Sequence, residues 1–376
     1  MDLRVVIAPD SFKGSADADA VSRAIAEGWS AVRPADHVRR LPMADGGEGT
    51  VDAFLASAPG AAGRSTAVEG PDGRPVSARW ALLPPTGSDG GPTAVLEIAQ
   101  TSGLGLMHPL RPLDGHTRGL GRLIVAALDA GATRILIGLG GSATSDGGSG
   151  ALQEIGARLT DERGGPIPPG NAGLASLAHV DLTALRRTPE DGVTLLTDVR
   201  SPLLGERGAA RMFGPQKGAS PAEVETLERN LTRFVRCVAT RRPDADAVSV
   251  RPGAGAAGGT GFGLALWGAD FRAGAQEVAA RLGLPAAIRE ADLVITGEGR
   301  FDEQTREGKV AAEVASLASA AGTPVLLVAG SIAADPAGFA DQVELSSLAG
   351  SVEASVADTV RWARRAGEVL AARRPG

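Results

Sequence analysis

The 376-residue chain has no tyrosine, only three lysines and a single cysteine, Cys237. One cysteine cannot form an intramolecular disulfide, and it excludes zinc sites built from paired cysteines. Aromatic residues make up only 3% of the chain, so the core must be built from Ala, Val, Leu and Ile, which a hydrophobic content of 43% supplies. This content excludes global disorder, and the length predicts two or three domains at roughly 150 residues each.

The chain also lacks an excess of basic over acidic residues, and it lacks long apolar runs. The net charge of −6 argues against nucleic-acid binding, because nucleic-acid-binding proteins usually carry a basic face. No stretch reaches the roughly 18 apolar residues that a membrane span requires, and the acidic Asp2 and short apolar run at the N-terminus do not match a signal peptide. We therefore expect a cytoplasmic protein with no nucleic-acid or membrane partner.

Lysine is scarce even among the basic residues. Of the 38 basic residues, 35 are Arg, and only Lys13, Lys217 and Lys309 are Lys. Arg can replace Lys at most solvated positions, so the remaining lysines are predicted to lie where a compact ammonium is needed. Each of the three is next to a glycine, which favours that interpretation over leftover surface lysines.

Apolar periodicity predicts alternating strands and helices at both ends of the chain. The expected elements at the ends are strands at 3–8, 38–43, 292–296 and 324–329, and helices at 17–32, 50–58, 310–320 and 352–374. The middle differs, with antiparallel strands expected at 76–83 and 93–98. These patterns predict an α/β protein with a discontinuous domain, residues 1–70 plus 285–376, and an inserted mixed α/β domain, residues 71–284.

Four glycine-rich loops stand at expected strand ends, at residues 44–50, 138–150, 252–263 and 296–302. Backbone amides in such loops can approach an anion closely, and a following helix N-terminus adds partial positive charge. The second loop combines glycines with hydroxyls, as phosphate-binding loops do, although Ala143 breaks the dinucleotide fingerprint and no Walker motif is present. Tight turns in a glycine-rich chain are the alternative interpretation.

Carboxylates accompany these loops or the end of a strand, at Asp10, Asp45, Asp198, Glu298 and Asp302. Acids there are costly to desolvate without a partner, and Mg²⁺ is a suitable one because it prefers oxygen ligands together with substrate phosphates. Helix-capping or turn roles are the alternative. Lysines, clustered acids and anion-binding loops together indicate phosphoryl transfer, and we expect Asp45, Asp198 and Glu298 to approach a common cleft.

Six motifs resemble the type 1 glycerate kinase family of bacterial D-glycerate kinases. They are IAPDSFKGS (7–15), PMADGGEGT (42–50), GLGGSAT (138–144), FGPQKGA (213–219), PGAGAAGG (252–259) and ADLVITGEGR (291–300). The resemblance implies two α/β domains with a cleft between them, one of them flavodoxin-like with a parallel sheet built from both chain ends. It also implies an ATP- and Mg²⁺-dependent kinase that phosphorylates D-glycerate, with 2-phosphoglycerate the favoured product, in a monomer or homodimer.

The residues and the resemblance together assign the site. The predicted catalytic residues are Lys13, Asp45, Asp198, Lys217 and Glu298, and Asp45 and Glu298 are also the predicted Mg²⁺ ligands. The predicted substrate- and phosphate-binding residues are Asp10, Ser11, Gly46, Gly47, Gly140, Gly141, Ser142, Thr144, Arg300, Asp302 and Lys309.

Departures from the family pattern leave alternatives open. The family usually has Asn where Ser145 stands and Thr-Asn where Arg200-Ser201 stand, so a non-catalytic sensor of hydroxy acids or nucleotides is one alternative. A dinucleotide-dependent oxidoreductase is another, suggested by the glycine loops and parallel sheet but disfavoured by the missing fingerprint.

Overall fold

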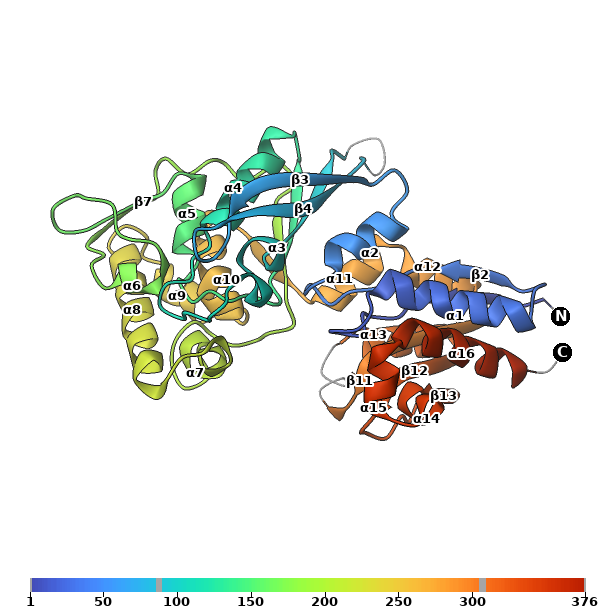
Figure 1. The fold of residues 1–376 in the computed structure, drawn as a ribbon. Coiled ribbons are helices and arrows are strands. Elements are labelled where there is room, and N and C mark those ends of the chain that lie inside the picture. The colour runs from blue at the N-terminus through green and yellow to red at the C-terminus, as the bar shows by residue number, and fades with distance from the viewer. Residues whose placement is uncertain (1, 86–89, 304–308, 375–376) are drawn as a thin grey trace. The chain divides into compact units, whose positions relative to one another are not determined.

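The computed structural model describes residues 2–85, 90–303 and 309–374 (Figure 1). The chain divides into two compact units. Unit 1 comprises residues 1–45, 52–59 and 273–376, and unit 2 comprises residues 46–51 and 60–272. The domain boundaries predicted from the sequence, at 70/71 and 284/285, lie C-terminal to the boundaries between these units at 59/60 and 272/273. The difference arises because β3 (Ala62–Glu69) pairs with a strand of unit 2, whereas α11 (Gly274–Arg281) packs on a helix of unit 1.

Unit 1 contains a five-stranded sheet in the order β13-β12-β11-β1-β2, and every neighbouring pair is parallel. Counted along unit 1 alone, this is the order 2-1-3-4-5 of flavodoxin-like folds, so the fold class predicted for the chain ends is confirmed. The strands are β1 (Arg4–Ile7), β2 (His37–Arg40), β11 (Leu293–Phe301), β12 (Val325–Ile332) and β13 (Asp341–Glu344).

Helices cover both faces of this sheet. The strand residues Val5, Ile7 and Ile295 share one apolar core with Trp29 of α1 and Leu370 of α16. Helices α12 and α13 pack against β1 and β11 as well, and strands covered on both faces become nearly continuous apolar runs. The helices of unit 1 are α1 (Ala18–Val32), α2 (Thr50–Ser57, its first two residues in unit 2), α11, α12 (Leu284–Glu290), α13 (Val310–Ala321), α14 (Leu345–Ala349), α15 (Val352–Ala357) and α16 (Thr359–Ala372).

The C-terminal segment differs from the single helix expected over 352–374. It forms two helices, α15 and α16, separated at Asp358, whose backbone has φ −146° and ψ 59°. The Asp358 carboxylate accepts a hydrogen bond from the Arg361 amide at 3.2 Å, and Ser351 caps α15 in the same way through the Ala354 amide. Two N-caps seven residues apart therefore divide the apolar pattern into two helices.

Two glycines allow α1 and α16 to cross in close contact, side by side in Figure 1. A Cβ atom on Gly28 would lie 1.9 Å from the Arg364 carbonyl oxygen, and one on Gly367 would lie 2.3 Å from the Ile25 carbonyl oxygen. The contact thus depends on the absence of side chains, although glycine is otherwise a poor residue for a helix interior.

We predict that Gly28→Ala destabilises the protein by about 1–3 kcal/mol, because the added methyl group forces the helices apart. Urea unfolding of the variant and the wild type measures this change. Gly105→Ala is the matched control, since a Cβ atom there meets no heavy atom within 4 Å. Equal midpoints for Gly28→Ala and the wild type would contradict the tight crossing.

Unit 2 contains a mixed six-stranded sheet in the order β10-β9-β6-β5-β4-β3. Strands β3, β4 and β5 pair antiparallel, and the remaining neighbours pair parallel, which confirms the antiparallel strands expected in the middle of the chain. Strands β7 and β8 form a separate antiparallel pair. The strands after β3 are β4 (Pro75–Leu83), β5 (Thr93–Glu97), β6 (Arg134–Gly138), β7 (Arg158–Thr160), β8 (His179–Asp181), β9 (Val193–Leu196) and β10 (Asp270–Arg272).

The helices of unit 2 include one that replaces an expected loop. Helix α10 begins inside the stretch 252–263, with a kink at Ala257, Gly258 and Gly259, whose φ angles are 52°, 64° and 87°. The helices are α3 (Ala99–Ser102), η1 (Leu104–Leu106), α4 (Arg118–Asp129), α5 (Ser149–Ile155), α6 (Gly170–Leu174), α7 (Ala209–Phe213), η2 (Pro215–Lys217), α8 (Pro221–Ala239), α9 (Ala245–Ser249) and α10 (Ala256–Trp267). In the described part of the chain, no helix combines the length and apolarity needed to cross a bilayer.

Candidate functional site

The candidate site lies in unit 1, at the carboxyl ends of β1 and β11. These strands are neighbours at the point where the strand order reverses, since the chain continues from β1 to β2 on one side and from β11 to β12 on the other. Open α/β sheets bind ligands at this switch point, outside the carboxyl ends of the strands. The segment from Asp10 to Ser15, which contains the predicted site residues Asp10, Ser11 and Lys13, follows β1 at this position.

Backbone pairing brings two acids from distant parts of the chain together. The Ala8 amide donates to the Ile295 carbonyl and the Asp10 amide donates to the Gly297 carbonyl, each at 2.8 Å, so β1 stays paired with β11 beyond its last strand residue. Asp10 and Glu298 are each only 6% exposed. Carboxylates held this deeply at a switch point are candidates for chemistry, because their burial has a cost in stability.

The pKa of Asp10 is raised to about 7. Burial is the main cause, followed by the negative charge of Asp45, with Glu298 adding a smaller effect. The Ser11 amide, which donates to Asp10 Oδ1 at 2.7 Å, and the Lys13 ammonium oppose the rise. A carboxyl group that changes protonation near neutral pH is suited to accept a proton from a substrate hydroxyl.

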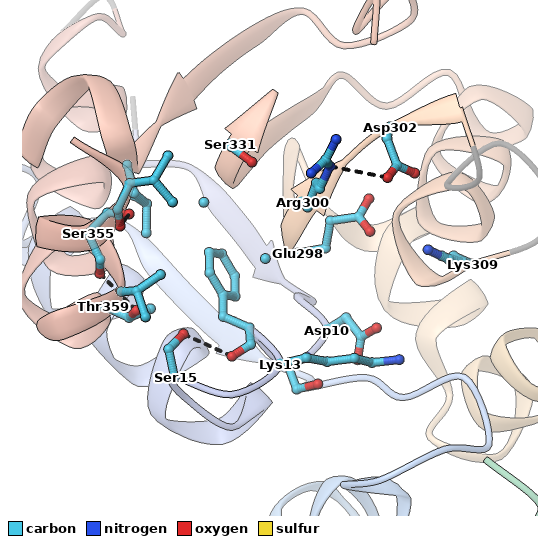
Figure 2. A pocket seen from close by; sticks show the side chains of 17 residues that line it. Asp10, Lys13, Ser15, Glu298, Arg300, Asp302, Lys309, Ser331, Ser355 and Thr359 are labelled. Carbon is cyan, nitrogen blue, oxygen red and sulfur yellow. Dashed lines mark hydrogen bonds and ion pairs between the residues drawn. The ribbon is translucent and has the colours of Figure 1, made fainter. Parts of the chain in front are cut away.

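Basic side chains face these acids. Lys13 Nζ lies 3.6 Å from Asp45 Oδ2, and the Lys13 side chain is 63% exposed. Arg300 Nε lies 3.4 Å from Asp302 Oδ2. Among the described residues, Asp10, Ser11, Lys13, Glu298, Arg300, Asp302 and Lys309 line one cavity of about 410 Å³, and Figure 2 shows the charged side chains gathered at one end of it. The structure thus brings together seven of the predicted site residues.

Residues 297–302 do not form the loop expected from their glycines. They continue β11 to Phe301, with Glu298 opposite Ala329 and Arg300 opposite Ser331 in the parallel pair with β12. The first glycine serves close packing, because a Cβ atom on Gly297 would lie 2.2 Å from the Val328 carbonyl oxygen. Glu298 and Arg300 are therefore held on a strand rather than in a loop, which gives them more precise positions.

The other predicted glycines lie in unit 2, where they pack against one another. The Gly140 amide donates to the Gly46 carbonyl at 3.2 Å. A Cβ atom on Gly140 would lie 2.5 Å from Gly47 Cα, and one on Gly141 would lie 2.8 Å from Glu48 Oε1. These glycines permit backbone-to-backbone contact between two loops, and their role in phosphate binding stays a prediction.

Lys217 is buried beside the same loop of unit 2. Its Nζ donates to Ser142 Oγ at 3.0 Å and to the Thr144 carbonyl at 2.6 Å, and the residue is 2% exposed. Burial lowers the pKa of Lys217 to about 7, against the opposing charge of Asp146. These contacts order the loop, and the predicted catalytic role of Lys217 is not tested by them. Asp198 also lies in unit 2, after β9, so the cleft shared with Asp45 and Glu298 of unit 1 stays a prediction.

Asp146 is a structural acid in this loop. Its carboxylate accepts hydrogen bonds from the Thr117 amide and hydroxyl at 2.9 and 2.8 Å, and from the Gly148 and Gly150 amides at 3.0 and 3.2 Å. Four donors hold the loop to the N-terminal ends of α4 and α5. This agrees with the capping and turn interpretation for a loop acid.

The acids of unit 1 supply the oxygen ligands that Mg²⁺ prefers, although they do not form a complete set of protein ligands. The described residues contain no group of three or more His, Cys, Asp or Glu arranged to hold a metal ion. Mg²⁺ in kinases is commonly held by one or two carboxylates, with phosphate oxygens and water completing the shell. Asp45 and Glu298, whose charges both act on Asp10, fit this partial ligand set.

Sequence reasoning missed the opposite wall of the cavity. Leu345, Val352, Ser355, Val356 and Thr359 line it, and they come from α14, α15 and α16. No glycine-rich loop or acid marks these positions, so no local signal could have indicated them. A larger cavity of about 870 Å³ lies in unit 2, but none of the predicted site residues lines it.

Buried acids and basic side chains around one cavity at the switch point of a flavodoxin-like sheet are typical of an α/β enzyme. Comparison with known proteins identifies the family of this chain. The glycerate kinase family pattern matches residues 5–373. The chain is 43% identical to the glycerate 2-kinase of Escherichia coli (strain K12), over 89% of this chain and 86% of that protein. It is 42% identical to the glycerate kinase of Bacillus subtilis (strain 168), with the same coverage.

A solved structure is similar as well. The crystal structure of a protein from Salmonella typhimurium LT2, provisionally assigned as glycerate kinase 2, superposes with a TM-score of 0.85 at 39% identity, covering 99% of this chain and 98% of that one. The chain therefore belongs to the glycerate kinase family, and it is a kinase.

Proposed function

We propose that this protein transfers the γ-phosphoryl group of ATP to D-glycerate, with the 2-hydroxyl as acceptor. The observation that carries the proposal is the cavity at the switch point of unit 1, where buried Asp10 and Glu298 face Lys13, Arg300 and Lys309. The E. coli relative, named as a glycerate 2-kinase, supports the choice of hydroxyl.

Each charged group has a role in this reaction. Asp10, with a pKa raised to about 7, accepts the proton of the attacking hydroxyl. Lys13 and Lys309 contact the phosphate oxygens, and the Arg300 guanidinium binds a carboxylate or phosphate in the forked geometry that suits it. Asp45 and Glu298 would hold Mg²⁺, which would neutralise the charge of the phosphates. Positioning and charge stabilisation supply most of the rate enhancement in phosphoryl transfer.

The test is a coupled assay of ADP release with purified protein, D-glycerate and MgATP, followed by phosphorus NMR of the product. We expect ADP release that depends on D-glycerate and a 2-phosphoglycerate signal. ATP binding without turnover would contradict the proposal and favour a sensor. Reduction of NAD by the same protein would favour the oxidoreductase alternative.

We predict that chelation abolishes the activity and that Mg²⁺ or Mn²⁺ restores it, because hard oxygen ligands favour these ions. Titration of the assay with EDTA and then with each metal measures the effect. The control adds EDTA already saturated with Mg²⁺, which should leave the rate unchanged. Full activity in excess EDTA would exclude a role for a divalent cation.

A further inference from the structure

Two exposed valines form part of the cavity that contains the buried acids. Val352 and Val356 are 51% and 52% exposed, and they are one turn apart on α15. Most large apolar residues of the described chain are buried, so exposed valines that line a cavity are candidates for ligand contact.

The cavity is polar at one end and largely apolar at the other. In Figure 2, Lys13, Glu298, Arg300, Asp302 and Lys309 lie at one end, whereas α15 and α16 carry Ser355 and Thr359 at the other. Both hydroxyls donate to backbone carbonyls of α15. Ser355 Oγ donates to the Val352 carbonyl at 2.8 Å, and Thr359 Oγ1 donates to the Ser355 carbonyl at 2.9 Å.

A wall of this kind offers packing to a flat apolar group. The buried Phe12 side chain and Leu345 extend the apolar lining, and the whole cavity of about 410 Å³ is within the usual size range of small-ligand sites. A nucleoside triphosphate matches this division, because it has an aromatic base at one end and a polyanion at the other.

We propose that the wall formed by Val352 and Val356 binds the base of the nucleotide, with the phosphates directed toward Lys13 and Lys309. This inference rests on the proposed use of ATP and adds the position of the base. It assigns α15 a part in nucleotide affinity that no motif of the sequence indicates.

The test compares two valine-to-alanine variants that differ in one respect. Val356→Ala removes two methyl groups from the cavity wall. Val360→Ala makes the same change at a valine that is 47% exposed on α16 and does not line the cavity. Calorimetric titration with ATP and with inorganic tripolyphosphate, which lacks the base, measures binding without requiring turnover.

We expect Val356→Ala to raise the Kd of ATP roughly fivefold to tenfold, in line with the loss of two buried methyl groups. The Kd of tripolyphosphate should stay unchanged, and Val360→Ala should change neither value. In the coupled assay, Val356→Ala should raise the KM of ATP and leave the KM of D-glycerate unchanged. Val352→Ala is a second variant with the same expectation.

The outcomes separate this inference from the proposed function. An unchanged Kd of ATP in both Val356→Ala and Val352→Ala, or an equal weakening of tripolyphosphate binding, would overturn the position of the base while leaving glycerate phosphorylation intact. ATP binding that is sensitive to Val356 without any turnover of D-glycerate would support the base position and contradict the proposed reaction. A protein that does not bind ATP would overturn both.

Discussion

Asp10→Asn is expected to abolish most of the kinase activity and, at the same time, to stabilise the fold at pH 8. An amide cannot accept the proton of the attacking hydroxyl, and general-base catalysis contributes roughly 10²–10⁴ in rate, so kcat should fall by that factor. The variant keeps the size of the side chain, removes its charge and replaces one carboxylate oxygen with an amide nitrogen.

The gain in stability follows from the pKa. The carboxyl group has an ordinary pKa of 3.8 and a pKa of about 7 in the folded protein, chiefly because of burial and the charge of Asp45. Above pH 7 the carboxyl group is ionised in the folded protein, where its charge is unfavourable, and in the unfolded chain, where it is not. Ionised Asp10 therefore destabilises the fold by about 4 kcal/mol. The Asp10→Asn variant does not bear this cost, and its advantage should shrink as the pH falls from 7 toward 4.

Urea unfolding between pH 4 and pH 8 and steady-state kinetics measure the two effects. Asp302→Asn is the matched control, because Asp302 lines the same cavity with a more exposed side chain paired to Arg300. It should alter stability by less than about 1 kcal/mol. In the wild type, kcat/KM should decline as the pH falls and Asp10 becomes protonated. Wild-type kcat in Asp10→Asn, or a loss of stability at pH 8, would rule out this role.

Lys13→Arg is expected to lower kcat by roughly 10²–10³, although the charge is conserved, by analogy with the removal of one donor from an oxyanion site. The Lys13 ammonium lies 3.6 Å from Asp45 and lines the cavity, where a compact charge can sit against a phosphate oxygen. A guanidinium is longer and planar, so it would displace the phosphoryl group from its in-line position.

Steady-state kinetics with a check of the melting temperature tests this prediction. Lys309→Arg is the comparison within the same cavity. Lys217→Arg is unsuitable as a test, since Lys217 is buried and a larger side chain there would disturb the loop that it orders. Near-wild-type turnover in Lys13→Arg would show that the scarcity of lysine has no chemical cause at this position.

The amino-acid sequence by itself determined the local features of this protein. Apolar periodicity predicted four of the five strands of the sheet in unit 1, and the strand expected at 3–8 placed Asp10 just beyond its end. The six motifs also predicted the family. These features depend on neighbouring residues, because side-chain periodicity and turn chemistry act over a few positions.

Only the tertiary structure decided which of the candidates meet. Asp10 and Glu298 come together because β1 pairs with a strand 288 residues further along the chain, with Ile7 opposite Ile295. Gly297 predicts a loop locally, yet it belongs to strand β11. It is a glycine there because close packing against β12 leaves no room for a side chain. Lys217 is buried and orders a loop through a hydrogen bond to Ser142, which is far from it in sequence. Val352 and Val356 line a cavity together with Asp10 and Lys13, which lie near the other end of the chain. Burial and strand pairing arise from the whole fold, so no local pattern could have indicated them.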